Sequence, residues 1–394
     1  MLRAIKYELN PTKTQKEQIK QTCGCCRLVY NTMLDRKIRA YKESGTTISA
    51  FELINQLPQL KSELSFLKEA PSQSLQQAIK NLDNAYANFF RKGGSGFPKF
   101  KKKGVRDSFR IPIACALDYD NWTVKVAKLG TIKIFKGHNK PISGSIKSYT
   151  ISHTSTDRYF ISVLYETADK TKLNNGKSVG IDLGIKNFAI LSDGKVFENQ
   201  KYLNHNLRKL RVLQRTVSRR YQQSKKREEQ SNNWKKAVKQ VAKLHEHIAF
   251  QRYNYLHKVS TWIADNYSTV CVETLNVKGI QKTHHLAQSV SDCGWGMFLN
   301  MLEYKCDNLV KINKWFASSQ ICSECGHKEE KVKNLAVREW TCPVCGAHHN
   351  RDLNAARNIE REGLSLCGLK VAEYCKPVPR TPQFNCGNSQ ICYL

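Results

Sequence analysis

The chain has 394 residues, with 64 lysines and arginines against 33 aspartates and glutamates, and a formal net charge of +31. Its hydrophobic fraction of 40% allows folded cores, which argues against a wholly disordered basic chain. A charge surplus of this size indicates a polyanionic partner. Nucleic acid is a better candidate than a membrane surface, because the sequence contains no amphipathic anchor or lipidation motif.

The 15 cysteines bear on the compartment in which the chain works. No run of about 18 apolar residues occurs, which argues against a transmembrane helix. The first ten residues contain no apolar stretch typical of a secretory signal. We therefore expect a reducing cytoplasmic setting close to the nucleoid, where a disulfide framework is disfavoured and no membrane is involved.

The first part of the chain is predicted to run from strand to helix and back to strand. Residues 1–10 have the character of a short strand, and apolar residues recur at helical spacing within 12–92. A glycine-rich stretch at 93–96 ends the last of these helices. From 107 to 167 polar and apolar residues alternate between turns, which predicts a small antiparallel β-barrel.

The second part of the chain, after a polar linker at 169–177, reads as mixed α/β. An apolar strand at 179–183 precedes a second strand at 187–192, and Asp193-Gly194 is a strong hairpin signal after it. A β-branched strand returns at 269–273, after a long helical segment.

Two segments concentrate the positive charge. Lys201–Ser260, the predicted helical pair, carries a net charge of +13. The second cluster is Lys101, Lys102 and Lys103, just after the glycine-rich stretch. Clusters of this kind neutralise phosphates and give an affinity that is sensitive to salt and largely independent of sequence.

Two C-x-x-C knuckles predict a zinc ribbon. Sixteen residues separate them, a spacing typical of structural zinc sites, and each knuckle is followed by a glycine suited to a left-handed turn. The predicted ligands are Cys322, Cys325, Cys342 and Cys345. His348 and His349 lie nearby, but four thiolates already complete a tetrahedral shell. Four buried cysteines with accidental spacing are the alternative.

Three carboxylates are candidates for a magnesium site. Asp182 lies in an apolar strand, Glu273 ends another, and Asp352 lies near the start of an alanine-rich helix. Acids in such places are costly to bury unless they are paired or bound to metal, and together they would suit Mg²⁺. Each has an ordinary alternative as well: a turn cap for Asp182, an ion pair with Lys278 for Glu273, and a helix N-cap for Asp352.

Several segments, in order along the chain, resemble motifs of TnpB proteins, the transposon-encoded OrfB family. The resemblance covers residues 1–362. The matching segments are 9–11, 30–31, 88–91, 96–100, 180–194, 272–279, 289–295, 302–305, the ribbon and 351–356.

The resemblance implies a multidomain α+β fold. A helical recognition lobe is inserted in a wedge-like β-barrel, and an RNase H-like α/β RuvC domain carries an inserted zinc ribbon. The expected boundaries are 1–10 and 107–167 for the barrel, 11–106 for the recognition domain, 178–315 and 350–362 for the RuvC domain, 316–349 for the ribbon, and 363–394 for a disordered tail.

The resemblance also implies an RNA-guided DNA endonuclease, related to type V CRISPR effectors. A transposon-end RNA, the ωRNA, would be scaffold and guide, and the protein would read a short motif beside the target in double-stranded DNA. The family's catalytic positions correspond to Asp182, Glu273 and Asp352. These three acids would together hold two Mg²⁺ ions. Gln76 lies near a position that touches the flanking DNA. A transposase encoded by the same element is a further expected partner.

Two positions depart from the family pattern, and two other functions compete. Thr274 and Asn350 stand where aspartates are frequent, which affects only the surroundings of the metal ligands. A transposase acting directly on transposon ends is disfavoured, because such enzymes usually have their acids in the order Asp, Asp, Glu. A nuclease-inactive RNA-guided regulator is disfavoured because all three acids are present.

Overall fold

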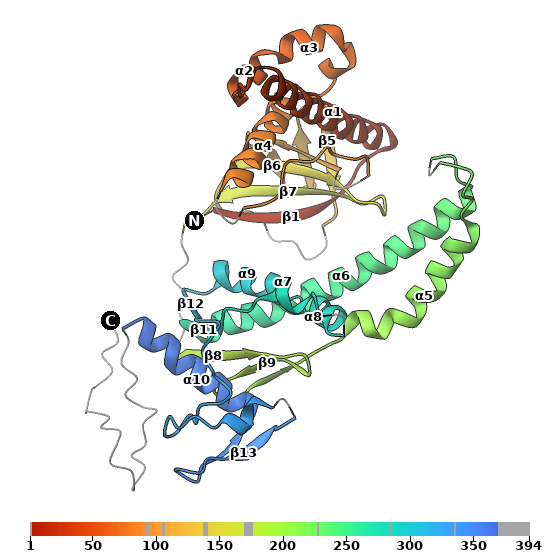
Figure 1. The fold of residues 1–394 in the computed structure, drawn as a ribbon. Helices are drawn as coiled ribbons and strands as arrows, with labels where there is room; N and C mark the ends of the chain where they lie inside the picture. The colour runs from red at the N-terminus through yellow and green to blue at the C-terminus, as the bar shows by residue number, and fades with distance from the viewer. Residues whose placement is uncertain are drawn as a thin grey trace. The chain divides into compact units, whose positions relative to one another are not determined.

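The computed structural model describes residues 2–91, 94–104, 107–136, 141–168, 176–226, 228–283, 285–334 and 336–368. The chain forms two compact units, Met1–Lys170 and Thr171–Leu394 (Figure 1). Most of the predicted linker at 169–177 and residues 369–394 of the predicted tail lie outside the described residues.

A seven-stranded sheet organises the first unit, in the order β2-β6-β7-β1-β5-β4-β3, and each pair of neighbouring strands is antiparallel. Its strands are β1 (Leu2–Asn10), β2 (Asp107–Ile111), β3 (Ala116–Asp118), β4 (Thr123–Val126), β5 (Gly130–Ile134), β6 (Ser145–His153) and β7 (Tyr159–Glu166). In the described ranges no pairing joins the two outer strands, so closure into a barrel stays a prediction.

The helices of the first unit lie in the chain between β1 and β2, so they are an insertion between two strands of one sheet. They are α1 (Lys13–Ser44), α2 (Ala50–Asn55), α3 (Leu57–Glu63), a 3₁₀ turn at Ser65–Lys68 and α4 (Ser72–Phe90). Thr12 and Gln15 form a capping box at the start of α1, and Gly45 ends it at φ 66°. Buried residues of α1 and α4 share one core with the sheet.

A five-stranded sheet organises the second unit, in the order β10-β9-β8-β11-β12. Its strands are β8 (Ser178–Leu183), β9 (Asn187–Leu191), β10 (Val196–Glu198), β11 (Thr269–Glu273) and β12 (Asn308–Ile312). The first three strands pair antiparallel, and the predicted turn at Asp193-Gly194 joins β9 to β10. β11 runs parallel to both β8 and β12.

Helices cover both faces of this second sheet. The helices are α5 (Tyr202–Arg220), α6 (Asn232–Asn266), α7 (Val277–Ile280), α8 (Ala287–Cys293), α9 (Trp295–Lys305) and α10 (Arg351–Leu366). Val270 and Val272 pack in a core with α6 and α9, whereas Cys271 packs with Ile359 of α10. Alternation along β11 therefore assigns one face to α6 and α9 and the other to α10.

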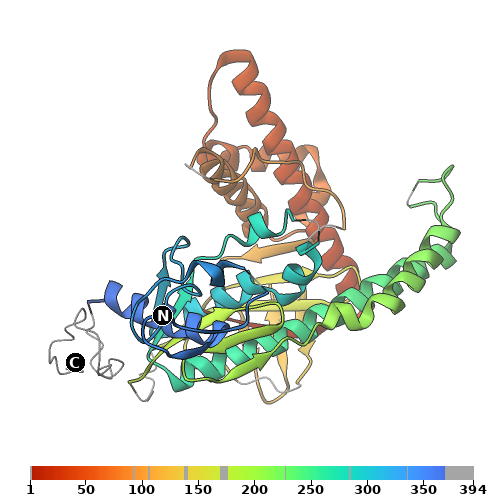
Figure 2. The same cartoon turned by 60° about the horizontal axis from the view of Figure 1, so that its bottom comes forward.

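The α5–α6 pair extends well beyond the edge of this sheet, as both ribbon views show (Figure 1, Figure 2). α10 continues to Leu366, so the expected start of the tail at 363 is wrong. The reason is packing: Leu364 is buried, and a Cβ added to Gly363 would lie 2.4 Å from the sulfur of Cys271.

The segment between β12 and α10 contains the predicted ribbon. It has a 3₁₀ turn at Glu330–Lys333 and a hairpin of β13 (Glu339–Thr341) and β14 (His348–Asn350). Among all the helices of the described residues, none has the length and apolar character needed to cross a membrane.

Candidate carboxylate and zinc sites

The sheet register brings Asp182 and Glu273 together. β8 and β11 are parallel neighbours, and their pairing runs to Ile181 opposite Val272. Asp182 and Glu273 are the next residue of each strand, so they occupy adjacent positions at the same edge of the sheet. Neighbouring strands lie about 4.8 Å apart, and equivalent residues point to the same face.

A glycine brings the third acid to the same face. A Cβ added to Gly180 would lie 2.0 Å from the carbonyl oxygen of Ala356, so the backbone of α10 lies directly against β8. Asp182 is two residues beyond Gly180 and shares its face of the strand. Asp352 is one helical turn before Ala356 and shares its side of the helix. The contact at Gly180 thus places Asp352 beside Asp182.

The three carboxylates interact electrostatically. The pKa of Asp182 is raised from 3.8 to about 7, first by burial and then by the negative charges of Glu273 and Asp352. Arg351 and Arg338 act in the opposite direction. Burial also raises the pKa of Glu273, against a hydrogen bond from Ser318. The site is therefore short of positive charge, and three oxygen donors that repel each other fit a hard divalent cation.

The hydrogen bonds around the acids test the alternative in which Asp352 is the N-cap of its helix. Asn350 is the N-cap of α10 and accepts from the N–H of Leu353 at 3.2 Å, so Asp352 is not the cap. Asp352 instead lies 3.4 Å from a guanidinium nitrogen of Arg338. Glu273 accepts from the hydroxyl of Ser318.

Two buried asparagines of α10, missed in the sequence, tie the acids to the ribbon. Asn354 accepts from the N–H of Ser323 at 2.8 Å and donates to the carbonyl of Ile321 at 2.7 Å. Asn358 donates to the carbonyl of Ser318 at 2.8 Å. Asn354 and Asn358 are four residues apart, so they share one face of the helix. Because buried amides need hydrogen-bond partners, this spacing could have indicated that this face packs against backbone groups.

The two departures from the family pattern have structural roles. The hydroxyl of Thr274 donates to the carbonyl of Ile312 at 2.7 Å, which joins the ends of β11 and β12. Asn350 supplies the helix cap described above. An asparagine or an aspartate can fill that position equally well.

The four cysteines converge in the ribbon. Their sulfur atoms all lie within 4.8 Å of one another, with 3.6 Å between Cys322 and Cys345 and 3.5 Å between Cys325 and Cys342. Zinc bonds of about 2.3 Å at tetrahedral angles require sulfurs about 3.8 Å apart, so the set fits Zn²⁺. Among described residues this is the one cluster of three or more His, Cys, Asp or Glu ligands at such spacing.

Local turns build each knuckle. The N–H of Gly326 donates to the carbonyl of Cys322, and that of Gly346 to the carbonyl of Cys342, both at 2.9 Å. Both glycines have positive φ, 79° and 72°, as the sequence predicts. Buried His349 contacts the cluster through Nε2, 3.0 Å from the sulfur of Cys322.

The predicted DNA-reading residues lie in the first unit. Gln76 is exposed on α4, and Lys101, Lys102 and Lys103 are exposed after it. Asn31 of α1 anchors this lysine segment by exchanging two hydrogen bonds with the backbone of Lys101, at 2.8 and 3.0 Å. Their role in binding nucleic acid stays a prediction.

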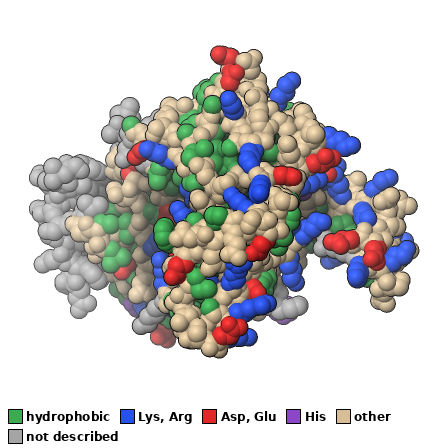
Figure 3. All heavy atoms as spheres, turned by 90° about the horizontal axis from the view of Figure 1, so that it is seen from above, with side chains coloured by type: hydrophobic (Ala, Val, Ile, Leu, Met, Phe, Trp, Pro, Cys, Tyr) green, Lys and Arg blue, Asp and Glu red, His purple; other side chains and the backbone are tan. Residues whose placement is uncertain are grey.

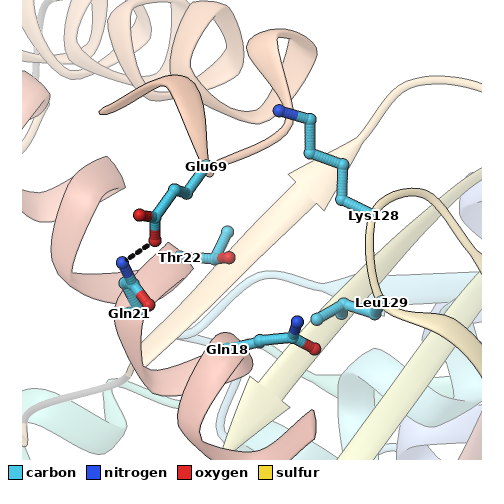
Figure 4. A pocket seen from close by; sticks show the side chains of 6 residues that line it. All are labelled: Gln18, Gln21, Thr22, Glu69, Lys128 and Leu129. Atoms are coloured by element: carbon cyan, nitrogen blue, oxygen red, sulfur yellow. Dashed lines mark hydrogen bonds between the residues drawn. The ribbon is translucent and has the colours of Figure 1, made fainter. Parts of the chain in front are cut away.

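A pocket of about 350 Å³ lies between α1 and the β4–β5 turn (Figure 4). In it, Gln21 donates to the carboxylate of Glu69. The lining residues are Gln18, Gln21, Thr22, Glu69, Lys128 and Leu129, none of which is a predicted site residue.

A row of exposed arginines lies along helix α5. Arg208, Arg211, Arg215 and Arg219 recur at helical spacing, and α5 contains no acidic residue. Arg211, Arg215 and Arg219 border an open groove of about 490 Å³. Figure 3 shows basic side chains (blue) over the visible face, including the projecting end of the α5–α6 pair at the right.

Three family models match parts of the chain. They are "Probable transposase" at residues 161–284, "Cas12f1-like, TNB domain" at 295–359 and "Helix-turn-helix domain" at 1–46. In the structure the last range holds a strand and one long helix, β1 and α1.

Two curated relatives match nearly the whole chain. A "Putative RNA-guided DNA endonuclease" of Streptomyces pristinaespiralis is 37% identical over 93% of this chain and 91% of its own length. The "Putative RNA-guided DNA endonuclease InsQ" of Escherichia coli K12 is 33% identical over 97% of each. The chain therefore belongs to the TnpB/OrfB family.

A solved Cas12f1–sgRNA–target DNA complex aligns with 91% of this chain and 99% of its own, at 16% identity and a TM-score of 0.33.

Proposed function

We propose that this protein is a transposon-encoded RNA-guided DNA endonuclease. A bound ωRNA pairs with one strand of double-stranded target DNA, and the protein reads a short flanking motif. Full-length relatives with that printed name support this function. The observation that carries the catalytic part is the convergence of Asp182, Glu273 and Asp352, expressed in the raised pKa of Asp182.

The domain assignment follows from the same proposal. Residues 178–315 and 350–366 are a RuvC nuclease domain of RNase H type, with 316–349 as its zinc ribbon. Residues 1–10 and 107–167 are the wedge, and 11–106 the recognition domain. The mixed sheet with α10 across the acidic face supports the first assignment, and the insertion of α1–α4 between β1 and β2 supports the second.

The carboxylates of Asp182, Glu273 and Asp352 would hold Mg²⁺. Two ions held there would supply activation of a water and charge stabilisation at the leaving oxygen of a phosphodiester. Asp182 must lose the proton that its surroundings favour before it can bind a cation. Ser318 holds Glu273 in place, and Arg338 lies next to Asp352, where its charge can meet a phosphate of the substrate.

The zinc of the ribbon is structural in this proposal, since four thiolates leave no open position for substrate. Its function is to hold the segment that contains Ser318 and the partners of Asn354 against α10.

The α5 arginines are the proposed contact for nucleic-acid phosphates. They are exposed, and in the described part of the chain none of the four forms an ion pair with a carboxylate. Contacts of this kind fix position without reading sequence.

Cleavage by the purified ribonucleoprotein tests the proposal. The protein is expressed with its native flanking DNA, the RNA that copurifies is sequenced, and a matched duplex is offered with Mg²⁺. We expect cutting by the wild type, and binding without cutting by Asp182→Ala. Strand-transfer products from transposon ends, or equal cutting by both proteins, would overturn it.

A further inference from the structure

The loop that joins β12 to the first zinc knuckle presents a tryptophan to solvent. Trp315 is 80% exposed. It lies three residues after Ile312, the register partner of Glu273, and three residues before Ser318, the hydrogen-bond donor to Glu273. The loop is therefore tied on both sides to one of the proposed catalytic acids.

The loop is also held in a defined conformation. The N–H of Trp315 donates to the side-chain oxygen of Asn313 at 3.0 Å, and the next residue, Phe316, packs into the cluster of Cys271, Ile312 and Ile359. Because Phe316 already occupies the interior, the indole of Trp315 is directed outward.

A cation accompanies this exposed ring. The ammonium nitrogen of Lys314 lies 4.7 Å from the ring centroid of Trp315. Isolated exposed apolar residues are common and need no explanation. Here, however, a large flat ring and an ammonium group are presented together beside a carboxylate site. An aromatic face stacks on any base, and a neighbouring cation meets the backbone phosphate.

We propose that Trp315 is a positioning residue that stacks on an unpaired base of the DNA strand in the carboxylate site, with Lys314 on the adjoining phosphate. This inference rests on the proposed nuclease function. Stacking fixes the strand relative to Glu273 and so sets where the scissile phosphate lies. Because every base has a π-face, the contact is independent of sequence.

Three substitutions separate ring stacking from bulk. Each variant is assayed as the full-length protein in complex with its RNA, beside the wild type. Trp315→Phe keeps an aromatic ring, Trp315→Leu keeps only apolar volume, and Trp315→Ala removes both. We expect kcat/KM for a matched duplex to fall about 10- to 100-fold in the leucine and alanine variants and to recover in the phenylalanine variant. Tyr304→Leu, at a 52% exposed aromatic on α9, is the matched control and should cleave like the wild type.

Substrates with single abasic sites give the decisive readout. If Trp315 stacks on a base, one abasic position near the cut lowers cleavage by the wild type but has no further effect on Trp315→Leu. A loss of equal size in both proteins, or wild-type kinetics in Trp315→Leu, overturns the inference. Unchanged zinc content and melting temperature confirm that the variant is folded. If the wild type itself does not cut, the proposed function fails instead.

Discussion

The cysteine cluster and the carboxylate cluster of the second unit are held by different means. The four thiols come from two turns of one short segment and lie within 4.8 Å of one another. The three carboxylates come from two strands and a helix, and their proximity depends on strand register and on the contact at Gly180. A cluster built from turns needs only its own segment, whereas a cluster built from a sheet needs the whole unit.

The electrostatics differ as well. Protonated thiols are neutral and can approach without repulsion. Partly buried carboxylates close to one another repel each other, and this repulsion contributes to the raised pKa of Asp182. The first cluster can therefore assemble by turn geometry, whereas the second depends on the packing of α10 to hold like negative charges together. The following experiments test that distinction, from the largest expected effect to the smallest.

Removal of one acid should give the largest effect. Asp182→Ala is expected to lower cleavage by roughly 10³-fold or more, because several kcal/mol of metal-dependent stabilisation are lost. Binding of RNA and target, measured by mobility shift, should remain. The exposed Asp265, at the end of α6, is the matched control, and Asp265→Ala should cut normally. Normal cutting by Asp182→Ala would remove that residue from the site.

Loss of one thiol should affect zinc before the rest of the unit. Cys322→Ser is expected to purify with little or no zinc, because three thiolates hold the ion poorly. Cleavage should then fall too, since the ribbon holds Ser318 against Glu273. The exposed Cys367 is the control: Cys367→Ser should keep one zinc per chain by metal analysis. Full zinc content in Cys322→Ser would contradict the ligand assignment.

One added methyl group should damage the acids and spare the zinc. In Gly180→Ala the new Cβ would lie 2.0 Å from the carbonyl of Ala356, so α10 must shift. We expect a loss of about 1–3 kcal/mol in the free energy of unfolding and a marked loss of cleavage, with zinc content unchanged. Gly296→Ala, in α9 with nothing within 4 Å, should be neutral or slightly stabilising. Equal stability of the two variants would refute the close contact.

The pH dependence of stability should report Asp182. Its pKa is about 7 in the folded protein and 3.8 ordinarily, so between these values the folded chain binds more protons than the unfolded chain. In metal-free buffer the free energy of unfolding should therefore fall as pH rises from about 4 to 7, by at most about 1.4 kcal/mol per unit. Asp182→Asn should weaken this slope and be more stable than wild type at pH 8. Identical pH profiles would contradict the assignment.

The smallest effect should come from one arginine of α5. Arg215→Ala is expected to weaken RNA binding modestly and to reduce the slope of log K against log salt by about 0.7 to 0.9, one phosphate contact. Affinity measured at several salt concentrations checks this. Glu229, near the tip of the pair, offers a control of opposite charge, and Glu229→Ala should not lower the slope. An unchanged slope in Arg215→Ala would place the nucleic acid elsewhere.

Residue patterns anticipated much of this fold. The alternating strands, the hairpin at Asp193-Gly194 and the basic helical pair are all present where expected. The roles of Ser318, Asn354 and Asn358 could not be anticipated, because their partners are backbone groups of a distant segment. The end of α10 was placed too early because the packing of Gly363 against Cys271 is invisible in the local sequence.

By itself the sequence determined which four cysteines cluster and the two turns that hold them, because spacing and glycine conformations act within a few residues. Tertiary structure alone decided that Glu273 and Asp352 lie close enough to Asp182 to raise its pKa. Their separation along the chain is closed by the parallel pairing of β8 with β11 and by the approach of α10 at Gly180. Long-range pairing depends on the whole hydrophobic core, which no short segment specifies.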